Sequence, residues 1–278
     1  MTRSGLGILL MACLLTDPAG GTEKLPALCP DRPGELTAAA DSGPQNTARI
    51  TGLSDAGEPV LADGTVLHLT DILYADRLGA LSDADRQALA VTRHASLTAL
   101  IEDGILLTCR LEPDRDRYGR LSGDAGTPDS GPLLRAHLLS EGLAVVLPRA
   151  ESRACCADLY RLEDEARRTE RGLWALSRAP YQKVDPKTGA AIIPDRRFAV
   201  VEGRIRSIGD RDYVIYLNFG FDWNRDFTVS LTKRLFEPTE LDRILTLIGK
   251  RVRVRGMADP WSGGRIAVTS PDQIEVLR

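Results

Sequence analysis

The sequence has few cysteines, no long apolar run beyond its first residues and no excess of one charge, and each shortage excludes a class of protein. Five cysteines in 278 residues are too few for a small domain built on disulfides, and no CxxC pair or Cys/His cluster has the spacing of a zinc site. The absence of a run of about 18 apolar residues after the N-terminus excludes a multi-pass membrane protein. The 36 Lys+Arg against 39 Asp+Glu exclude a polybasic nucleic-acid coat, but not a local basic groove.

The first 21 residues have the pattern of an export signal. Arg3 precedes an apolar stretch, residues 6–15, that is too short to span a bilayer, and small residues at 19–21 offer a cleavage site. Leu10, Met11, Ala12 and Cys13 also resemble a lipoprotein box in which Cys13 would carry the lipid. The pattern predicts an exported protein, periplasmic or secreted, with a lipid anchor as the alternative to ordinary cleavage.

The cysteines that remain after such a signal are Cys29, Cys109, Cys155 and Cys156. An oxidising compartment would let some of them form disulfides. Adjacent cysteines are strained when bridged to each other, so Cys155 or Cys156 would pair with a distant partner. Cys29 lies in an arm rich in proline that a disulfide would hold in place. The sequence leaves all three connectivities open.

The pattern of apolar and turn residues divides the chain into two domains. Residues 22–46 are an arm, 47–176 a first domain, 177–195 a linker with three prolines, and 196–278 a second domain. In the first domain we expect strands at 48–53, 59–61, 65–69, 105–110 and 143–147, and helices at 82–103, 132–141 and 158–171. In the second domain, extended stretches at 200–208, 213–218, 227–231, 251–257, 265–269 and 273–277 accompany one helix at 241–247. This set fits a small barrel of the OB type, with another small barrel or a sandwich as the alternative.

Three motifs in the first domain carry a family resemblance. They are Asp-Arg-Tyr-Gly-Arg at 116–120, the segment Ala-His-Leu-Leu-Ser-Glu-Gly-Leu-Ala at 136–144, and Arg-Gly-Leu-Trp at 171–174, which closes a charged helix. In this order they resemble the staphylococcal nuclease-like (thermonuclease) family. The resemblance implies an OB barrel with three helices. The predicted fold class is therefore mainly β with α, in two OB-type β-barrels, the first of the staphylococcal nuclease-like kind.

The resemblance also implies calcium-dependent hydrolysis of phosphodiester bonds in DNA and RNA. That chemistry needs acidic oxygens to hold calcium, a carboxylate to position water and two arginines on the phosphate. Arg120 matches the second arginine, and Tyr118 and Arg117 match a tyrosine and a basic residue beside the nucleotide. The first arginine is replaced by His68, which is also well explained as a structural histidine.

The acidic positions of the family are mostly substituted in this chain. Leu73 stands at a calcium-binding aspartate, and Asp76 stands at the glutamate that positions water but is one carbon shorter. Gly57 stands at the other aspartate, although a shift of one residue would bring Glu58 there. Asp71 lies two residues from Leu73 and would have to replace it from a distance. We therefore expect no cofactor, and calcium only if the nuclease site functions.

The second domain carries a basic strand and most of the aromatic residues. Residues 195–278 have a net charge of +3, and the rest of the chain −6. Arg251, Arg253 and Arg255 alternate with valines and follow Lys250, which is typical of a phosphate-tracking stripe or of a solvated barrel face. Alternation places Tyr213, Ile215, Leu217, Phe219 and Phe221 on one inward face. This half resembles, more weakly, the OB-like tail that follows some bacterial thermonuclease-like domains.

Three functions are compatible with these features. The first is an exported binding module for single-stranded nucleic acid or an envelope protein, in which the nuclease site has degenerated. The second is an active nuclease with a rearranged site around Arg120, His68 and Asp76. The third is a structural protein of the cell envelope. Contact with a membrane is expected only through a lipid on Cys13, and the oligomeric state is left open.

Overall fold

The computed structural model describes residues 49–102, 108–127, 131–132, 134–149, 156–222 and 224–277. The predicted signal, the arm, Cys13, Cys29 and Cys155 lie outside this part, as do the side chains of Cys109 and Cys156, so the expected lipidation and disulfides fall on residues that are not described. The described residues form a mixed α/β structure with four α-helices and several sheets. None of the described helices is both long and apolar enough to cross a membrane.

The first domain contains small sheets around three helices. Its strands are β1 (Ile50–Leu53), β2 (Pro59–Leu61), β3 (Leu67–Leu69), β4 (Ile72–Tyr74), β5 (Thr108–Arg115), β6 (Leu121–Thr127), β7 (Gly131–Pro132) and β8 (Ala144–Val146). They pair as β1-β2, as β3-β6-β5 with β7 on β6, and as β4-β8. The helices are α1 (Asp83–Glu102), α2 (Leu134–Ser140) and α3 (Cys156–Arg168). The three helices and strands β1, β2, β3 and β8 lie close to their predicted positions, β5 begins within its predicted range and extends beyond it, and β4, β6 and β7 were not predicted.

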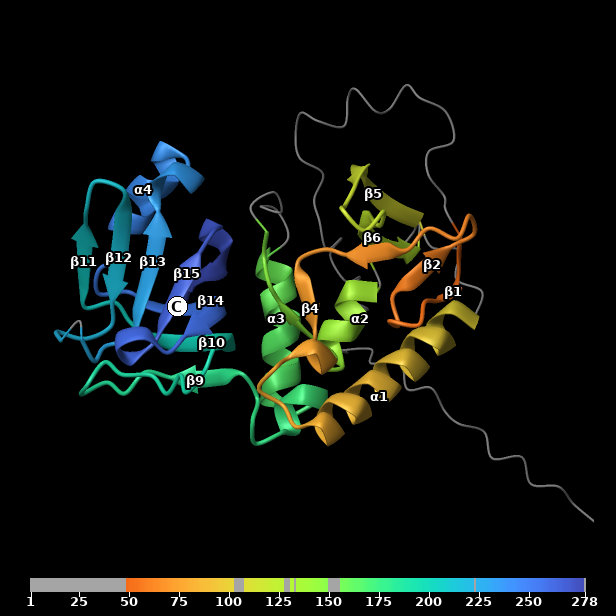
Figure 1. Cartoon of the computed structure of the whole chain (residues 1–278), viewed down its shortest axis with the longest axis horizontal. Helices are drawn as coiled ribbons and strands as arrows, with labels where there is room; N and C mark the ends of the chain where they lie inside the picture. Colours follow the sequence, from red (N-terminus) through yellow and green to blue (C-terminus); the bar gives the residue numbers. More distant parts are fainter. Residues whose placement is uncertain are drawn as a thin grey trace, which may run out of the picture.

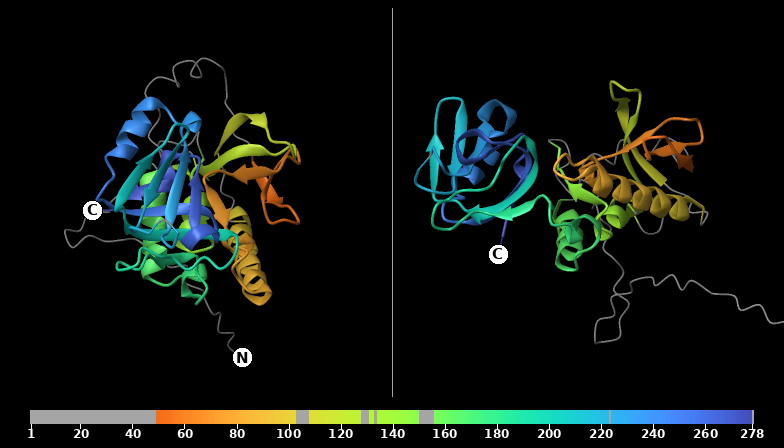
Figure 2. Two further views of the ribbon diagram at one scale, coloured as in Figure 1. Left: turned by 60° about the vertical axis from the view of Figure 1, so that its left-hand side comes forward. Right: turned by 60° about the horizontal axis from the view of Figure 1, so that its bottom comes forward.

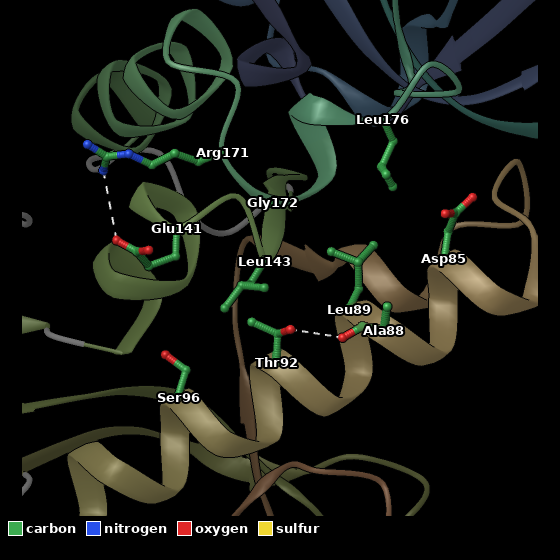
Figure 3. A pocket seen from close by; sticks show the side chains of 10 residues that line it. All are labelled: Asp85, Ala88, Leu89, Thr92, Ser96, Glu141, Leu143, Arg171, Gly172 and Leu176. Atoms are coloured by element: carbon green, nitrogen blue, oxygen red, sulfur yellow. Dashed lines mark hydrogen bonds and ion pairs between the residues drawn. The ribbon is translucent and has the colours of Figure 1, made fainter.

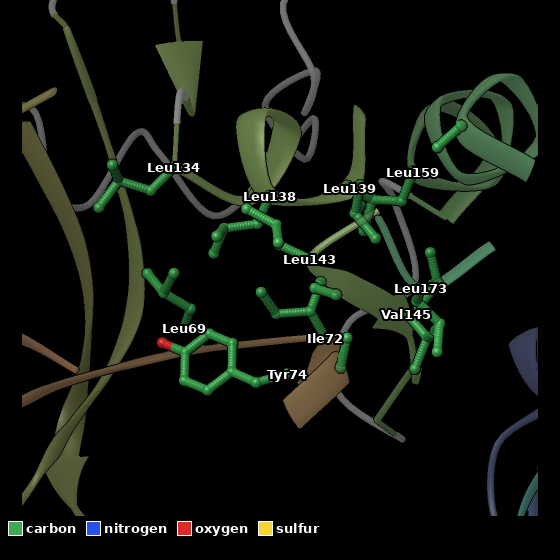
Figure 4. Close-up of a cluster of buried hydrophobic side chains, with 14 of the residues drawn as sticks. Leu69, Ile72, Tyr74, Leu134, Leu138, Leu139, Leu143, Val145, Leu159 and Leu173 are labelled. Atoms are coloured by element: carbon green, nitrogen blue, oxygen red, sulfur yellow. The ribbon is translucent and has the colours of Figure 1, made fainter. Parts of the chain in front are cut away.

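Local chemistry explains where these helices begin and end. The Ser82 hydroxyl accepts the Asp85 backbone N–H at 3.1 Å and so begins α1 as a side-chain cap. After α2 the chain reverses at Gly142, whose φ of +65° favours glycine. Leucines of α2 and α3 then pack on Tyr74, Leu143 and Val145 in the core of this domain (Figure 4).

The second domain is built on one long sheet. Its strands are β9 (Tyr181–Lys183), β10 (Arg197–Arg204), β11 (Ser207–Asp210), β12 (Val214–Asn218), β13 (Thr228–Thr232), β14 (Arg251–Asp259), β15 (Arg265–Val268) and β16 (Ile274–Val276), and α4 spans Pro238–Leu245. The strand order is β11-β12-β13-β15-β14-β10-β9, with β16 on β14. β13 and β15 run parallel, and the other pairs are antiparallel except β10 with β9.

The segment expected to be a linker is part of this packing. Residues Tyr181–Lys183 form β9 and pair with β10 of the second domain. Val184 and Ile193 are buried in the core of that domain. The prolines and small residues of 177–195 predicted an interdomain linker, and in the structure part of this segment packs on the sheet of the second domain.

The two domains lie side by side, and α3 faces the second domain (Figures 1 and 2). Phe198 and Val200 of β10 belong to the apolar core that the first domain forms. Arg255 of β14 reaches Glu163 of α3 at 2.6 Å, and both side chains are buried. Apolar and ionic contacts therefore join the two domains.

The apolar alternation in the second domain ends with its strand. Ile215, Leu217 and Phe219 are buried as expected, with Phe219 edge-on to Phe227 at 5.2 Å between ring centroids. Tyr213 and Phe221, expected on the same inward face, are instead 80% and 88% exposed. Tyr213 lies one residue before β12 and Phe221 three residues after it, whereas Phe219, one residue after β12, still donates its N–H to Phe227 O and stays buried.

Candidate functional site

A buried carboxylate, Glu58, lies at the centre of the residues that the nuclease resemblance singled out. It ends a turn in which the Gly57 N–H donates to Ser54 O and the Glu58 N–H donates to the Ser54 hydroxyl. The turn and strand β2 together bury the Glu58 side chain, which is 5% exposed. Glu58, and not Gly57, therefore supplies the side chain of this turn that points toward Arg120.

Three cationic or protonatable side chains converge on this carboxylate. Arg120 Nη1 lies 3.0 Å and 3.2 Å from the two Glu58 oxygens. Arg77 Nη1 and His68 Nδ1 lie 3.3 Å and 3.4 Å from Glu58 Oε1. We call Glu58, His68, Arg77 and Arg120 the Glu58 cluster. Its members come from the turn before β2, from β3, from the short 3-10 helix after β4 and from the turn before β6, segments that the sheets bring together.

The charges of the Glu58 cluster keep its carboxylate ionised. Burial alone would raise the pKa of Glu58, but the hydrogen bond with His68 and the positive charges of Arg77 and Arg120 outweigh burial and lower it to about 2. Arg120 is held further by Asp116, whose Oδ2 lies 2.8 Å from both Nε and Nη2. The Arg120 guanidinium is therefore shared between two carboxylates.

Asp76, expected as the residue that would position water, has a different partner. Its two oxygens accept hydrogen bonds from Nε and Nη2 of Arg93 at 2.8 Å and 2.9 Å. Arg93 is buried on α1, donates to Gly57 O at 2.5 Å and lies over the Tyr74 ring at 4.3 Å. This arginine was not singled out from the sequence. The sequence feature that could have identified Arg93 is its position four residues after Leu89 and four before Leu97, on the buried face of α1.

The side chains at this place do not suit calcium, which needs six to eight oxygen ligands. Glu58 and Asp76 are each engaged by guanidinium groups, and Leu73 offers no oxygen. Asp71 does not replace Leu73, because its Oδ2 lies 2.9 Å from Arg135 Nη1 and its Oδ1 accepts the Arg149 N–H. In the part of the chain that the structure describes, no group of three or more His, Cys, Asp or Glu could hold a metal ion.

The hairpin turn between β5 and β6 presents an exposed tyrosine beside arginines. Asp116 Oδ1 accepts the backbone N–H groups of Tyr118 and Arg120 at 2.9 Å and 3.0 Å, which fixes the turn. The φ of +76° at Gly119 suits glycine at this position. Tyr118 is 66% exposed, and the guanidinium carbons of Arg117 and Arg120 lie 4.8 Å and 5.2 Å from its ring centroid.

The basic strand of the second domain lies mostly at the junction between the domains. Arg253 and Arg255 are 5% and 0% exposed, and their partners include Asp164 and Glu163 of α3. The expected phosphate stripe therefore loses these two arginines to the interior, because α3 covers that face of β14. Arg251 remains 52% exposed although it contacts Glu202, and Lys250 is exposed.

A hollow of about 330 Å³ lies elsewhere, between α1 and the segment from Glu141 to Leu176 (Figure 3). Ser96 lines it and lies 2.5 Å from His137 Nε2, and burial lowers the pKa of His137 against the opposing effect of Glu141. Arg171 Nη1 lies 3.8 Å from Glu141 at its rim. None of the predicted catalytic or nucleic-acid-binding residues lines this hollow.

Comparisons with known proteins bear on the first domain only. A search of curated proteins finds no match. The family described as Staphylococcal nuclease homologue matches residues 98–176, a range that includes the Tyr118 turn and Arg120 but not Glu58, His68 or Asp76. The chain therefore contains an SNase-like domain at residues 98–176.

Proposed function

We propose that the SNase-like domain binds single-stranded nucleic acid without cleaving it. The observation that carries this proposal is the pairing of Glu58 with Arg120, Arg77 and His68. In a nuclease of this family, the acidic side chains hold calcium and the arginines face the phosphate. Here the carboxylate neutralises the arginines directly, so neither half of the hydrolytic machinery is free.

The second carboxylate of the expected site supports the same conclusion. Both oxygens of Asp76 accept hydrogen bonds from Arg93, which is 3% exposed. To activate water, Asp76 would have to give up this bidentate pair and leave a buried guanidinium without a carboxylate to balance its charge, which costs several kcal/mol. The Asp76–Arg93 pair therefore disfavours a rearranged active site built on Asp76.

The binding surface that we propose is the Tyr118 turn. Base stacking on an exposed aromatic ring, with arginine nearby for the phosphate, is the usual way to bind single strands without reading sequence. Tyr118 offers such a ring on a turn that Asp116 holds rigid. Arg117 makes no ion pair within the described residues, so its charge is available to a phosphate.

The topology of the second domain agrees with the barrel that the sequence predicts. We propose that it is an OB-type barrel, because β10 and β11, which only two residues separate, lie on opposite sides of the run β12-β13-β15-β14, as one continuous segment does when it closes such a sheet. Parallel pairing of β13 with β15 and the position of α4 between β13 and β14 agree with that topology.

We further propose, from the N-terminal pattern alone, that the protein is exported.

A combined hydrolysis and binding assay tests the function. Labelled single-stranded DNA is incubated with calcium or with chelator, and its binding is measured over a salt series. We expect no release of nucleotides in either condition and binding that weakens as salt rises. Tyr118→Ala should weaken binding about fivefold or more, and Arg117→Ala should reduce the salt dependence.

The chain offers a matched control for this assay. Tyr213 is also an exposed tyrosine that follows a nearby arginine, Arg211, but it belongs to the second domain. Tyr213→Ala and Arg211→Ala should leave binding unchanged. Calcium-dependent release that Arg120→Ala abolishes would instead establish an active nuclease. No binding even at low salt would refute the nucleic-acid proposal and favour a structural role in the envelope.

A further inference from the structure

Three loops at one end of the second domain carry large apolar side chains that are about half exposed or more, although the Arg265 guanidinium lies over the Trp261 ring, 4.9 Å from its centroid. Ile192 lies between β9 and β10, Phe221 between β12 and β13, and Trp261 between β14 and β15. Their exposed fractions are 84%, 88% and 49%. We call these three residues and the loops that carry them the loop end. Figure 1 shows the connection from β12 to β13 on the same side of this domain as β9.

Backbone contacts hold the three loops together. The Phe227 N–H donates to Gly189 O at 2.8 Å, and the Thr228 N–H donates to Gly264 O at 3.0 Å. A Cβ added to Gly189 would lie only 2.5 Å from the Gly220 Cα, so these two loops touch without room for a side chain. The exposed side chains are therefore presented together by a rigid base.

The apolar chemistry of this surface calls for a partner. Burying one such side chain is worth about 1.5–3 kcal/mol relative to leaving it in water. A single exposed residue needs no explanation, but three on adjacent loops at one end of the domain are what an interaction site would present. The sequence pattern alone placed Phe221 in the core, and the structure directs it outward.

We propose that the loop end docks on a lipid bilayer by inserting these side chains into its interfacial region. Trp and Phe side chains are favoured at the boundary between headgroups and acyl chains. Side chains that protrude from separate loops suit a fluid surface, which closes around each of them. The protein-binding alternative needs a partner with a matching pocket for each tip.

The charges of the loops distinguish this surface from the Tyr118 turn. Residues 185–197, 219–227 and 259–265 carry as many acidic as basic side chains. Several of the acids have partners, since Asp195 pairs with Arg197 and Asp259 pairs with Arg265. The docking is therefore hydrophobic and depends little on lipid charge or on salt. It does not rest on nucleic-acid binding, whose strength falls as salt rises.

The test is sedimentation of the full chain with vesicles of phosphatidylcholine alone and of phosphatidylcholine with phosphatidylglycerol. The variant replaces the loop-end residues by Ile192→Ser, Phe221→Ser and Trp261→Ser. A matched variant carries Tyr213→Ser, Leu235→Ser and Ile248→Ser, three exposed apolar residues beyond the other ends of the strands. The apolar stretch at residues 6–15 contributes to all forms, so the result is the ratio between variants.

We expect the loop-end variant to bind both kinds of vesicle at least about tenfold more weakly than wild type. The affinity of the matched variant should stay within about twofold of that of wild type. Brominated phosphatidylcholine should quench the tryptophan fluorescence of wild type, and less so that of Trp261→Phe. Circular dichroism checks that each variant is folded. Equal binding by the two variants, or a wild type that remains in the supernatant, would overturn the proposal. Concentration-dependent dimers that the loop-end variant abolishes would assign the surface to a second copy instead.

Discussion

Arg255 Nη1 lies 2.6 Å from Glu163 Oε1, and the two side chains are 0% and 2% exposed. Glu163 belongs to α3 of the first domain and Arg255 to β14 of the second. The other Glu163 oxygen accepts the Val146 N–H at 2.6 Å, and Arg255 Nη2 lies 3.2 Å from Glu275. A charged pair in the interior thus ties the SNase-like domain to the domain that follows it.

Removing one member of this pair should be costly. Arg255→Met leaves Glu163 buried without its cation, so we expect the free energy of unfolding to fall by about 3–5 kcal/mol. Adding Glu163→Gln should restore part of the loss, because the amide carries no charge. Urea unfolding followed by circular dichroism measures both effects. Arg251→Met, on the same strand but at a half-exposed position, should cost less than about 1 kcal/mol. A cost for Arg255→Met no larger than this control would contradict the prediction.

The Glu58 cluster should make stability sensitive to acid. The pKa of Glu58 is lowered to about 2 from an ordinary value of 4.5. Its contribution to stability is therefore fully present above about pH 4.5 and is lost as the pH falls toward 2. Glu58→Gln should cost about 1–3 kcal/mol at neutral pH and flatten this part of the pH profile. Urea unfolding at a series of pH values measures the free energy of unfolding of wild type and Glu58→Gln, and Glu141→Gln, at an exposed position, is the control. An unchanged slope in Glu58→Gln would show that other groups cause the acid sensitivity.

Asp226 should change the pH dependence of stability in the direction opposite to Glu58. Burial raises the pKa of Asp226, although the Asp222 N–H lowers it in part by donating to its Oδ2. A carboxyl whose pKa is raised in the folded state loses stability as the pH rises through that pKa. Asp226→Asn keeps an acceptor for Asp222 and removes the charge. Wild type should therefore become less stable relative to Asp226→Asn as the pH rises from 3 to 7. A difference that stays constant over this range would refute the assignment.

Gly142 tests how closely the end of α2 approaches the end of the SNase-like segment. A Cβ at this position would lie 2.2 Å from Arg171 O, and φ is +65°. Gly142→Ala should lower the free energy of unfolding by at least about 2 kcal/mol, from both the backbone conformation and the clash. Gly64→Ala is the matched control, because its φ is +84° and nothing lies within 4 Å of the added Cβ. Equal losses in the two variants would mean that the clash is relieved at no cost.

Features set by neighbouring residues could be predicted from the sequence. The cap at Ser82, the reversal at Gly142 and the tight turn at Gly119 depend on a few adjacent residues, and the first two lie at the expected limits of the helices at 82–103 and 132–141. The three motifs in order led to the SNase-like domain, which the family match at residues 98–176 supports.

The partners of the charged side chains were decided only by tertiary structure. Alternation put Arg253 and Arg255 on one face of a strand, but it could not reveal that α3 covers this face and supplies their carboxylates. Glu58 and Arg120 are 62 residues apart and meet through the pairing of their strands. The sequence determined which local structures form, because those depend on short-range sterics and hydrogen bonds. Which charges are buried, paired or left to a ligand depends on segments distant in the chain, and the packed fold alone brings these together.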